Sequence, residues 1–546
     1  MLFNSITYVI FLPVVYIIYR ILPYHRQNIW LLLASYIFYA WWDIRFLFLI
    51  ILSTIVNYCC GIIIKDGEIK VRDRTKASLM LIISCFFLVV VNWNYLLLPQ
   101  ENLAVYFDWR AFTSTKEGWI LFLLVGLTII ASNLFYSSTI KTDGKKKHLF
   151  ALVIGISANL CILGFFKYYN FFIENVEWLI RSFSMDPSRF HLNIILPIGV
   201  SFYTFKGIGY VVDVYREHCE PERDYKNFAL FIAFFPALLA GPIDRAKDLL
   251  QQIAMARRIT NKQTFRGLHL IFYGLFKKIV IADGVVKTVH SVFSSTGQAS
   301  WIDVVVATVL FTLQIYCDFS GYTDIARGTA KLFGINLMVN FNLPYFSQNP
   351  REFWSKWHVS LSTWLRDYLY IPLGGNRNGK VKTYQNLIIT MVLGGLWHGA
   401  AWNFILWGFY HGVVLAIHRV ISTAKSVITI QASLLNTITK TALFFSITCY
   451  GWLIFRAPSW EKVMTLSSTL IFDFGNLHFG AARPRAAALF GIPIFLCIEF
   501  IENAKNGTSF YKSLPMPLWT ALYACMIFGL VIGMSTGATQ FIYFNF

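Results

Sequence analysis

The chain has 546 residues, of which 56% are hydrophobic and only 14% are charged. Soluble domains of ordinary composition carry about 25% charged residues, so the composition excludes such a domain and indicates a membrane protein. The net charge of +19 comes from basic residues in short loops between apolar segments, which the positive-inside rule explains without nucleic-acid binding. Because apolar segments of about 20 residues recur from end to end, residues 1–546 are predicted to form one polytopic domain in contact with membrane lipids.

The N-terminal part alternates apolar segments with loops of different charge. Its first segment, Leu2–Tyr19, lacks the basic region and the cleavage pattern of a secretory signal, so it is expected to remain as the first span. Basic loops near residues 23, 70 and 145 alternate with a loop from Gln100 to Lys116 that is poor in Lys and Arg. This alternation predicts an extracytoplasmic N-terminus and cytoplasmic basic loops.

Two segments in the middle of the chain do not fit ordinary spans. After the apolar segment Leu149–Phe166, a stretch to Phe190 is rich in Phe and Tyr with mixed charge, and we expect it on the membrane surface. The segment Phe228–Leu239 is too short to span and is followed by Gly241 and Pro242, which favours a re-entrant segment. A strongly basic loop over residues 245–266 follows and is predicted to be cytoplasmic.

Polar and aromatic residues interrupt the chain between residues 304 and 377. Gln314 and Asp318 fall at or near membrane depth, where such residues are either cavity-lining groups or helix-end caps. Residues 340–377 are aromatic, basic and interrupted by prolines, which suits a short helix that dips into the membrane from the cytoplasmic side. The alternative is an interfacial helix without a catalytic role, anchored by Trp354, Trp357 and Trp364.

The most informative stretch is Gly394–Gly399, inside a long apolar run from Tyr384 to Tyr410. It contains His398, and an ionisable group at membrane depth usually faces a bundle interior or a wet cavity. Low dielectric favours the neutral imidazole, which can accept a proton from a hydroxyl, so His398 is a candidate general base. In the alternative interpretation, His398 is a hydrogen-bonded residue at a helix interface, where Gly395 and Gly399 allow close packing.

A second histidine, His358, lies in Phe353-Trp354-x-x-Trp357-His358-x-Ser360-Leu361-Ser362. This motif, its continuation to Gly375 and the Leu393–Gly399 stretch together resemble the membrane-bound O-acyltransferase family, in the bacterial branch of the alginate O-acetylation membrane protein and the teichoic acid D-alanyl transfer protein. Leu196–Phe202, Ala240–Pro242 and Asp318–Tyr322 support the resemblance. It covers residues 150–420, the predicted catalytic core.

The resemblance implies an all-α polytopic fold around a central funnel, for which we predict roughly 11 to 13 transmembrane helices plus re-entrant or interfacial helices. Residues 66–140 look like an inserted pair of spans, and residues 423–546 supply C-terminal spans that match little of the pattern. By position, His398 takes the family's catalytic role, His358 matches its second histidine, and His411 is a supporting residue. The sequence offers further candidates for lining the tunnel or binding the donor: Gln314, Asp318, Trp354, Lys356, Arg366, Arg377, Trp397, Asn403 and His411.

The expected function is an O-acyltransferase of the bacterial inner (plasma) membrane that moves an acyl group, foremost acetyl, to an extracytoplasmic acceptor. The product would be an O-acetylated exported polysaccharide or other envelope polymer, as in alginate-type acetylation. D-alanyl transfer and peptidoglycan O-acyl transfer remain open. A transporter or flippase, in which broken helices and midplane histidines mark a proton-coupled path, is the alternative from another class.

The reaction is expected to use acetyl-CoA as a cytoplasmic donor and no bound cofactor. The nine cysteines include no C-x-x-C pair, so the sequence predicts neither a disulfide framework nor a metal site. A polymer hydroxyl cannot readily enter a narrow apolar funnel, and we therefore expect an extracytoplasmic (periplasmic) acyltransferase or acyl carrier protein as partner. The aromatic rings of Tyr106, Phe107 and Trp109 mark a candidate docking surface for it, with an aromatic belt at the membrane interface as the alternative.

Overall fold

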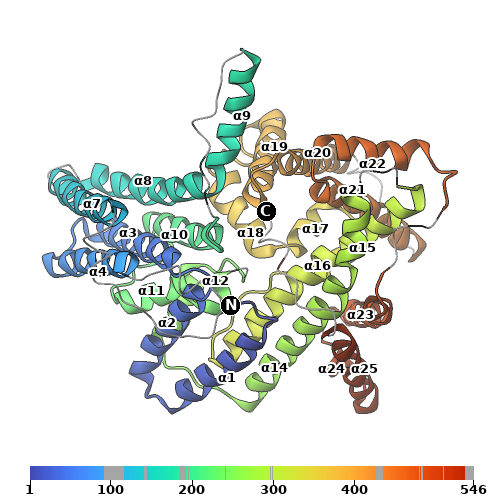
Figure 1. Ribbon diagram of the computed structural model, residues 1–546, viewed down its shortest axis with the longest axis horizontal. Coiled ribbons are helices and arrows are strands. Elements are labelled where there is room, and N and C mark those ends of the chain that lie inside the picture. The colour runs from blue at the N-terminus through green and yellow to red at the C-terminus, as the bar shows by residue number, and fades with distance from the viewer. Residues whose placement is uncertain are drawn as a thin grey trace.

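The computed structural model describes residues 1–90, 116–140, 144–183, 192, 194, 196–239, 241–295, 297, 299–424, 434–478, 480, 484–507, 509–534 and 541. All regular elements in these ranges are helices (Figure 1). Those of the N-terminal part are α1 (Ile6–Ile21), α2 (Tyr24–Ala40), η1 (Ile44–Phe46), α3 (Leu47–Asp66), α4 (Val71–Val90), α7 (Lys116–Ile140), α8 (Gly144–Leu163), η2 (Gly164–Tyr168), α9 (Tyr169–Ser182), α10 (Val200–Tyr215), α11 (Tyr225–Ala233), α12 (Phe235–Leu238) and α13 (Ala246–Ala254).

The later elements include a few short helices between long ones. They are α14 (Asn261–Leu275), η3 (Phe276–Ala282), α15 (Asp283–Phe293), α16 (Trp301–Leu332), η4 (Pro344–Phe346), α17 (Pro350–Lys356), α18 (Val359–Leu365), η5 (Arg366–Tyr370), α19 (Gly379–His398), α20 (Trp402–Ala424), α21 (Leu434–Arg456), α22 (Trp460–Phe472), α23 (Ala486–Ala504), α24 (Phe510–Ser513) and α25 (Met516–Met534). Three of the short elements, η2, η3 and η5, are π-helical turns.

Helix starts follow from local sequence. Ser5, Thr260 and Ser300 accept a backbone N–H with their side-chain oxygens at the starts of α1, α14 and α16. Such N-caps satisfy donors that the first turn of a helix leaves without an intrahelical partner. The apolar runs that follow these caps then continue as helices.

Seven described helices are long and apolar enough to cross a membrane: Leu47–Asp66, Gly144–Ser182, Trp301–Leu332, Trp402–Thr423, Leu434–Arg456, Ala486–Ala504 and Met516–Met534. Shorter apolar helices cover Ile6–Ile21 and Phe122–Ala131. The prediction of an all-α polytopic membrane protein is confirmed, and the number of spans stays a prediction. The predicted docking loop, including Tyr106, Phe107 and Trp109, lies outside the described residues.

The centre of the bundle is formed by α10, α11, α12 and α16. Every residue of α10 from Val200 to Val214 is buried, as is every residue from Phe228 to Leu239. The segment expected to be re-entrant therefore forms two short helices inside the bundle, where its irregular backbone is shielded from lipid. In Figure 1, α17 and α18 lie near the centre of the view, between α16 and the α19–α21 group.

Glycines bring two helix pairs into close contact. A Cβ atom at Gly274 would overlap the Gly321 carbonyl oxygen, which places α14 directly against α16. A Cβ atom at Gly395 would overlap the carbonyl oxygen of Phe404, which does the same for α19 and α20. The helix-packing role of Gly395 considered from the sequence is therefore correct, and it does not exclude a role for His398.

The segment after Phe166, expected on the membrane surface, is helical, and its position relative to the membrane stays a prediction. The helix continues through η2 into α9, so that residues Gly144–Ser182 form one helical unit of 39 residues. In Figure 1, α9 projects from the bundle, while α8 packs beside α3 and α10. The continuation fixes the direction of the side chains in η2, which becomes important at the site.

Candidate active site

His398 is the last residue of α19 and is buried. Its imidazole packs between aromatic rings, with ring centroids 5.1 Å from Trp407 and 5.6 Å from Phe455, both at nearly perpendicular angles. After it the backbone turns through Gly399 and α20 begins at Trp402. The sequence places the histidine at the point where an apolar helix ends inside the protein.

His358 joins α17 to α18 and has a positive φ of 42°, which is uncommon for a residue with a side chain. Two backbone-to-side-chain contacts hold this conformation. The Leu361 N–H donates to His358 Nδ1 at 3.4 Å, and the Ser360 N–H donates to Asn340 Oδ1 at 3.1 Å. The Ser360 hydroxyl donates to the same Asn340 oxygen at 2.9 Å, so Asn340 fixes the start of α18.

The hydrogen bond at Nδ1 sets the proton position on the His358 ring. A neutral imidazole has one donor and one acceptor nitrogen, and an Nδ1 that accepts leaves the proton on Nε2. Within the described part of the chain, the buried Nε2 atom has no hydrogen-bond partner. His358 therefore offers an N–H donor to a ligand.

The structure brings the two predicted histidines together from separate segments. Their ring centroids are 6.4 Å apart and their planes are inclined at 65°. Trp397 lies against both, with centroid distances of 5.9 Å to His358 and 5.1 Å to His398. A reacting group between the rings could contact one histidine as a base and the other as a donor.

A wall of tryptophans surrounds the pair. Trp357 packs on Trp452, Trp452 stacks on Trp407, and Trp407 contacts His398. Trp357 and Trp364 are buried inside the bundle, which contradicts the interfacial-anchor interpretation of this segment. Trp364 donates its indole N–H to the Phe205 carbonyl at 3.1 Å and thereby attaches α18 to α10.

His411 and Trp354 lie at the edge of this wall. Their rings are 5.3 Å apart, and His411 lies 4.9 Å from Trp407. Trp407 therefore stands between His411 and His398. This arrangement agrees with a supporting position for His411, and its part in lining the tunnel or binding the donor stays a prediction.

Two of the predicted tunnel residues lie on α16. Asp318 belongs to the interior of α16 and accepts an ion pair from Lys278 Nζ at 2.7 Å, so the helix-cap alternative is wrong. Gln314 is buried, and its Oε1 atom has no partner among the residues that the structure describes. Gln314 thus keeps an acceptor for a ligand or water, whereas Asp318 is occupied by a lysine.

The predicted basic donor-binding residues and Asn403 have partners or exposure of their own. Lys356 pairs with Glu352 at 2.8 Å, Arg366 pairs with its neighbour Asp367 at 2.7 Å, and Arg377 is exposed. Asn403 donates to the carbonyl oxygens of Phe455 and Ala457 at 3.2 and 3.1 Å and so links α20 to the end of α21. These contacts leave the basic residues at the surface, where an anionic donor could meet them.

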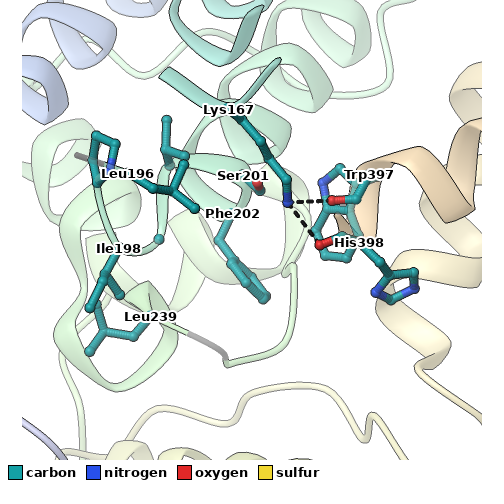
Figure 2. Close-up of a pocket in the computed structure, with 11 residues that line it drawn as sticks. Lys167, Leu196, Ile198, Ser201, Phe202, Leu239, Trp397 and His398 are labelled. Carbon is teal, nitrogen blue, oxygen red and sulfur yellow. Dashed lines mark hydrogen bonds between the residues drawn. The ribbon is translucent and has the colours of Figure 1, made fainter. Parts of the chain in front are cut away.

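The sequence analysis missed Lys167 in η2. Its Nζ atom donates to the carbonyl oxygens of Trp397 at 2.6 Å and His398 at 3.0 Å (Figure 2). Lys167 and His398 both line a cavity of about 50 Å³, together with Ser201 and the start of α10. The only signal in the sequence was a lysine at the end of the apolar segment Leu149–Phe166.

Over the described ranges, no three His, Cys, Asp or Glu side chains are grouped so that they could hold a metal ion.

A many-helix membrane fold with two buried histidines and an enclosing tryptophan wall defines a membrane-embedded enzyme for acid–base or transfer chemistry. A model of the membrane-bound O-acyltransferase family matches residues 220–457. The chain is 35% identical to the probable alginate O-acetylase AlgI of Azotobacter vinelandii over 481 residues, covering 87% of this chain and 79% of that protein. Identity to AlgI of Pseudomonas aeruginosa is 36%, with 87% and 76% covered.

A third relative is named for a different polymer. The peptidoglycan O-acetyltransferase of Helicobacter pylori is 29% identical, with 100% of this chain and 98% of that protein covered. With these matches, the chain belongs to the membrane-bound O-acyltransferase family. It is a multi-pass membrane O-acyltransferase, as the resemblance of its histidine motifs predicted.

Proposed function

We propose that the histidine pair catalyses transfer of an acetyl group from a thioester donor to a hydroxyl. The observation that carries this proposal is the convergence of His358 and His398, whose rings lie 6.4 Å apart inside the tryptophan wall. His398 removes the proton of the attacking hydroxyl as general base. The new C–O bond forms, the C–S bond breaks, and the proton passes from His398 to the leaving thiolate.

His358 acts as a hydrogen-bond donor in this proposal. Its Nδ1 atom accepts the Leu361 N–H, so the Nε2–H can donate to the thioester carbonyl oxygen as negative charge develops on it. His358, which itself has the positive φ, is followed by Ser360, and the Asn340–Ser360 contacts hold this segment in place before the reaction. The two histidines then divide the work of a base and an oxyanion donor.

The donor is proposed to be acetyl-CoA, reaching the site from the cytoplasm of a bacterial cell whose inner membrane holds the protein. The exposed Arg366 and Arg377 are suited to attract its phosphates. With the N-terminus extracytoplasmic, basic residues such as Lys145 face the cytoplasm. A cysteine at Lys145, in a background without accessible thiols, should resist an impermeant reagent added outside intact cells, and a cysteine at Asn102 should react.

The acceptor side is proposed to be an exported polysaccharide or another envelope polymer, as the names of the alginate and peptidoglycan relatives suggest. A tryptophan-lined interior suits one small acyl group better than a polymer chain. We therefore propose that an extracytoplasmic acyltransferase or acyl carrier takes the acetyl group from this protein. Liposomes with acetyl-CoA at the cytoplasmic face should acetylate free polysaccharide on the other side only when that partner is supplied.

The direct test compares envelope polymers from cells that produce the intact protein or its His398→Ala variant. Mass analysis should find ester-linked acetyl groups with the intact protein and none above background with the variant. Ester-linked D-alanine in place of acetyl would redirect the proposal to D-alanyl transfer. Equal acetylation with both proteins, at equal amounts of folded protein, would rule out His398 as the base.

A further inference from the structure

The helix that carries His398 ends inside the protein, where its last carbonyl groups have no intrahelical donors. Such carbonyls need partners, because an unsatisfied buried polar group is costly. Three of them are satisfied by two consecutive residues of η2. Tyr168 donates its hydroxyl to the Leu396 carbonyl at 3.0 Å, and Lys167 donates to the carbonyls of Trp397 and His398.

Lys167 and Tyr168 both belong to the π-helical turn between α8 and α9. A π-turn is wider than an α-helical turn, and such turns are frequent at functional sites. In η2 it brings both Lys167 and Tyr168 to the end of α19, which is 228 or more residues away in the sequence.

The partners of Lys167 distinguish it from an ordinary buried lysine. Within the described residues, no carboxylate forms a salt bridge with it, and its two hydrogen bonds are to carbonyl oxygens. The C-terminal end of a helix carries partial negative charge, which stabilises a cation placed there. An ammonium group has three N–H donors, so one remains for the adjacent cavity of about 50 Å³, which is large enough for water.

The hydrogen bonds of Lys167 and Tyr168 with the end of α19 bear on the orientation of His398. Figure 2 shows Lys167 bonded to the backbone of Trp397 and His398, while the imidazole points away from the cavity. The opposite side of the imidazole is enclosed by Trp407 and Phe455. A shift of the last turn of α19 would therefore move the ring relative to His358.

We propose that Lys167 is a positioning residue for His398: its ammonium group holds the last turn of α19 so that the imidazole faces the reacting hydroxyl. The proposal rests on the function of His398 as base given above. The contacts of Lys167 are with the backbone carbonyls of Trp397 and of the catalytic residue, so its proposed action is through His398. Tyr168 assists at the preceding carbonyl.

The test compares Lys167→Met, which keeps the length of the side chain but removes its donors, with Lys167→Arg, which keeps donors and charge. Ester-linked acetyl per envelope polymer is measured in cells and normalised to the amount of folded protein, determined by size-exclusion chromatography. Because small displacements of catalytic groups can cost about 10²-fold in rate, Lys167→Met should lower acetylation by about that factor. Lys167→Arg should restore most of it, and Tyr168→Phe should lose less than Lys167→Met.

Asn175→Ala is the matched control. Asn175 in α9 accepts the Trp402 indole N–H at 3.0 Å, so it also ties the α8–α9 unit to the α19–α20 hairpin without touching His398. This variant should acetylate at the rate of the intact protein. An equal loss in Asn175→Ala, or no rescue by Lys167→Arg, would show that Lys167 only supports packing.

His398→Ala, measured alongside, separates the two proposals. If His398→Ala is inactive and Lys167→Met is normal, the positioning role is refuted while the catalytic role of His398 stands. If His398→Ala is active, the catalytic role itself fails and the positioning role falls with it. Loss in both, with rescue by Lys167→Arg, supports both.

Discussion

Two π-helical turns in the described structure carry lysines, half-buried in η2 and buried in η3, and the partners of these lysines differ. In η3, Lys277 pairs with Asp324 at 2.6 Å, and Lys278 pairs with both Asp283 and Asp318 at 2.7 Å. In η2, Lys167 meets backbone carbonyl oxygens at the end of the helix that carries His398. The lysines of η3 hold it to α15 and α16 through ion pairs. Lys167 of η2 instead holds α19, the helix that carries His398, through backbone carbonyl groups.

The comparison shows that membrane depth alone does not identify a functional residue. Buried ionisable residues in spans are functional candidates by default, and Asp318 was one on that ground. Its pairing with Lys278 gives it a sufficient structural reason to be there. Lys167 lacks such a carboxylate partner in the described structure, and its position is coupled to His398.

The largest effect on acyl transfer is expected when the proposed general base, His398, is removed. His398→Ala should lower acyl transfer by about 10² to 10⁴-fold, because a positioned general base contributes that much to the rate. The folded amount should change little. The measurement is ester-linked acetyl per folded protein, and near-normal acetylation would contradict the assignment.

Lys278→Met tests the ion pairs that Lys278 of η3 forms with Asp283 and Asp318. Removing one partner leaves the buried carboxylates of Asp283 and Asp318 without this cation, which should cost about 3–5 kcal/mol of stability. The expected result is a strongly lowered unfolding temperature of the detergent-solubilised protein. Lys167→Met, which leaves no carboxylate behind, should lose less stability and more activity per folded molecule. If Lys167→Met lost more stability and less activity than Lys278→Met, the proposed difference between the lysines of η2 and η3 would be wrong.

Variants of His358 test whether this residue acts as a hydrogen-bond donor while His398 acts as the base. His358→Ala removes the Nε2 donor and should lower the rate by about 10²-fold, which is typical for the loss of one oxyanion donor. His358→Gln keeps an N–H donor and should retain more activity than His358→Ala. If the two variants are equally inactive at equal amounts of folded protein, loss of the N–H donor does not explain the effect of His358→Ala.

The smallest effect is expected for an exposed ion pair. Arg223 bonds both carboxylate oxygens of Asp66, at 2.6 and 3.0 Å, but its side chain is 65% exposed. Exposed pairs contribute about 1 kcal/mol or less, so Arg223→Ala should leave the unfolding temperature and activity near those of the intact protein. A loss as large as that of Lys278→Met would mean that burial does not set the strength of these pairs.

Much of the site could be predicted because its motifs are local in the sequence. The Trp357-His358 and Trp397-His398 pairs carried the resemblance, and the fold brings both histidines into one aromatic enclosure. Lys167 could not be predicted in the same way, since its partners lie 230 and 231 positions away. Nor could hydropathy identify the carboxylate opposite Lys278, because pairing across helices depends on their rotation and register.

The sequence by itself determined that this is an all-α membrane protein, which family it belongs to and which two histidines stand in its motifs. Composition and hydropathy suffice for the fold class because lipid permits few backbone structures, whereas the family follows from the resemblance of the histidine motifs. Only the tertiary structure decided that Asp318 forms an ion pair, that Trp407 separates His411 from His398, and that Lys167 closes the end of α19. These contacts arise from helix packing between distant segments, which glycines such as Gly395 allow to approach closely.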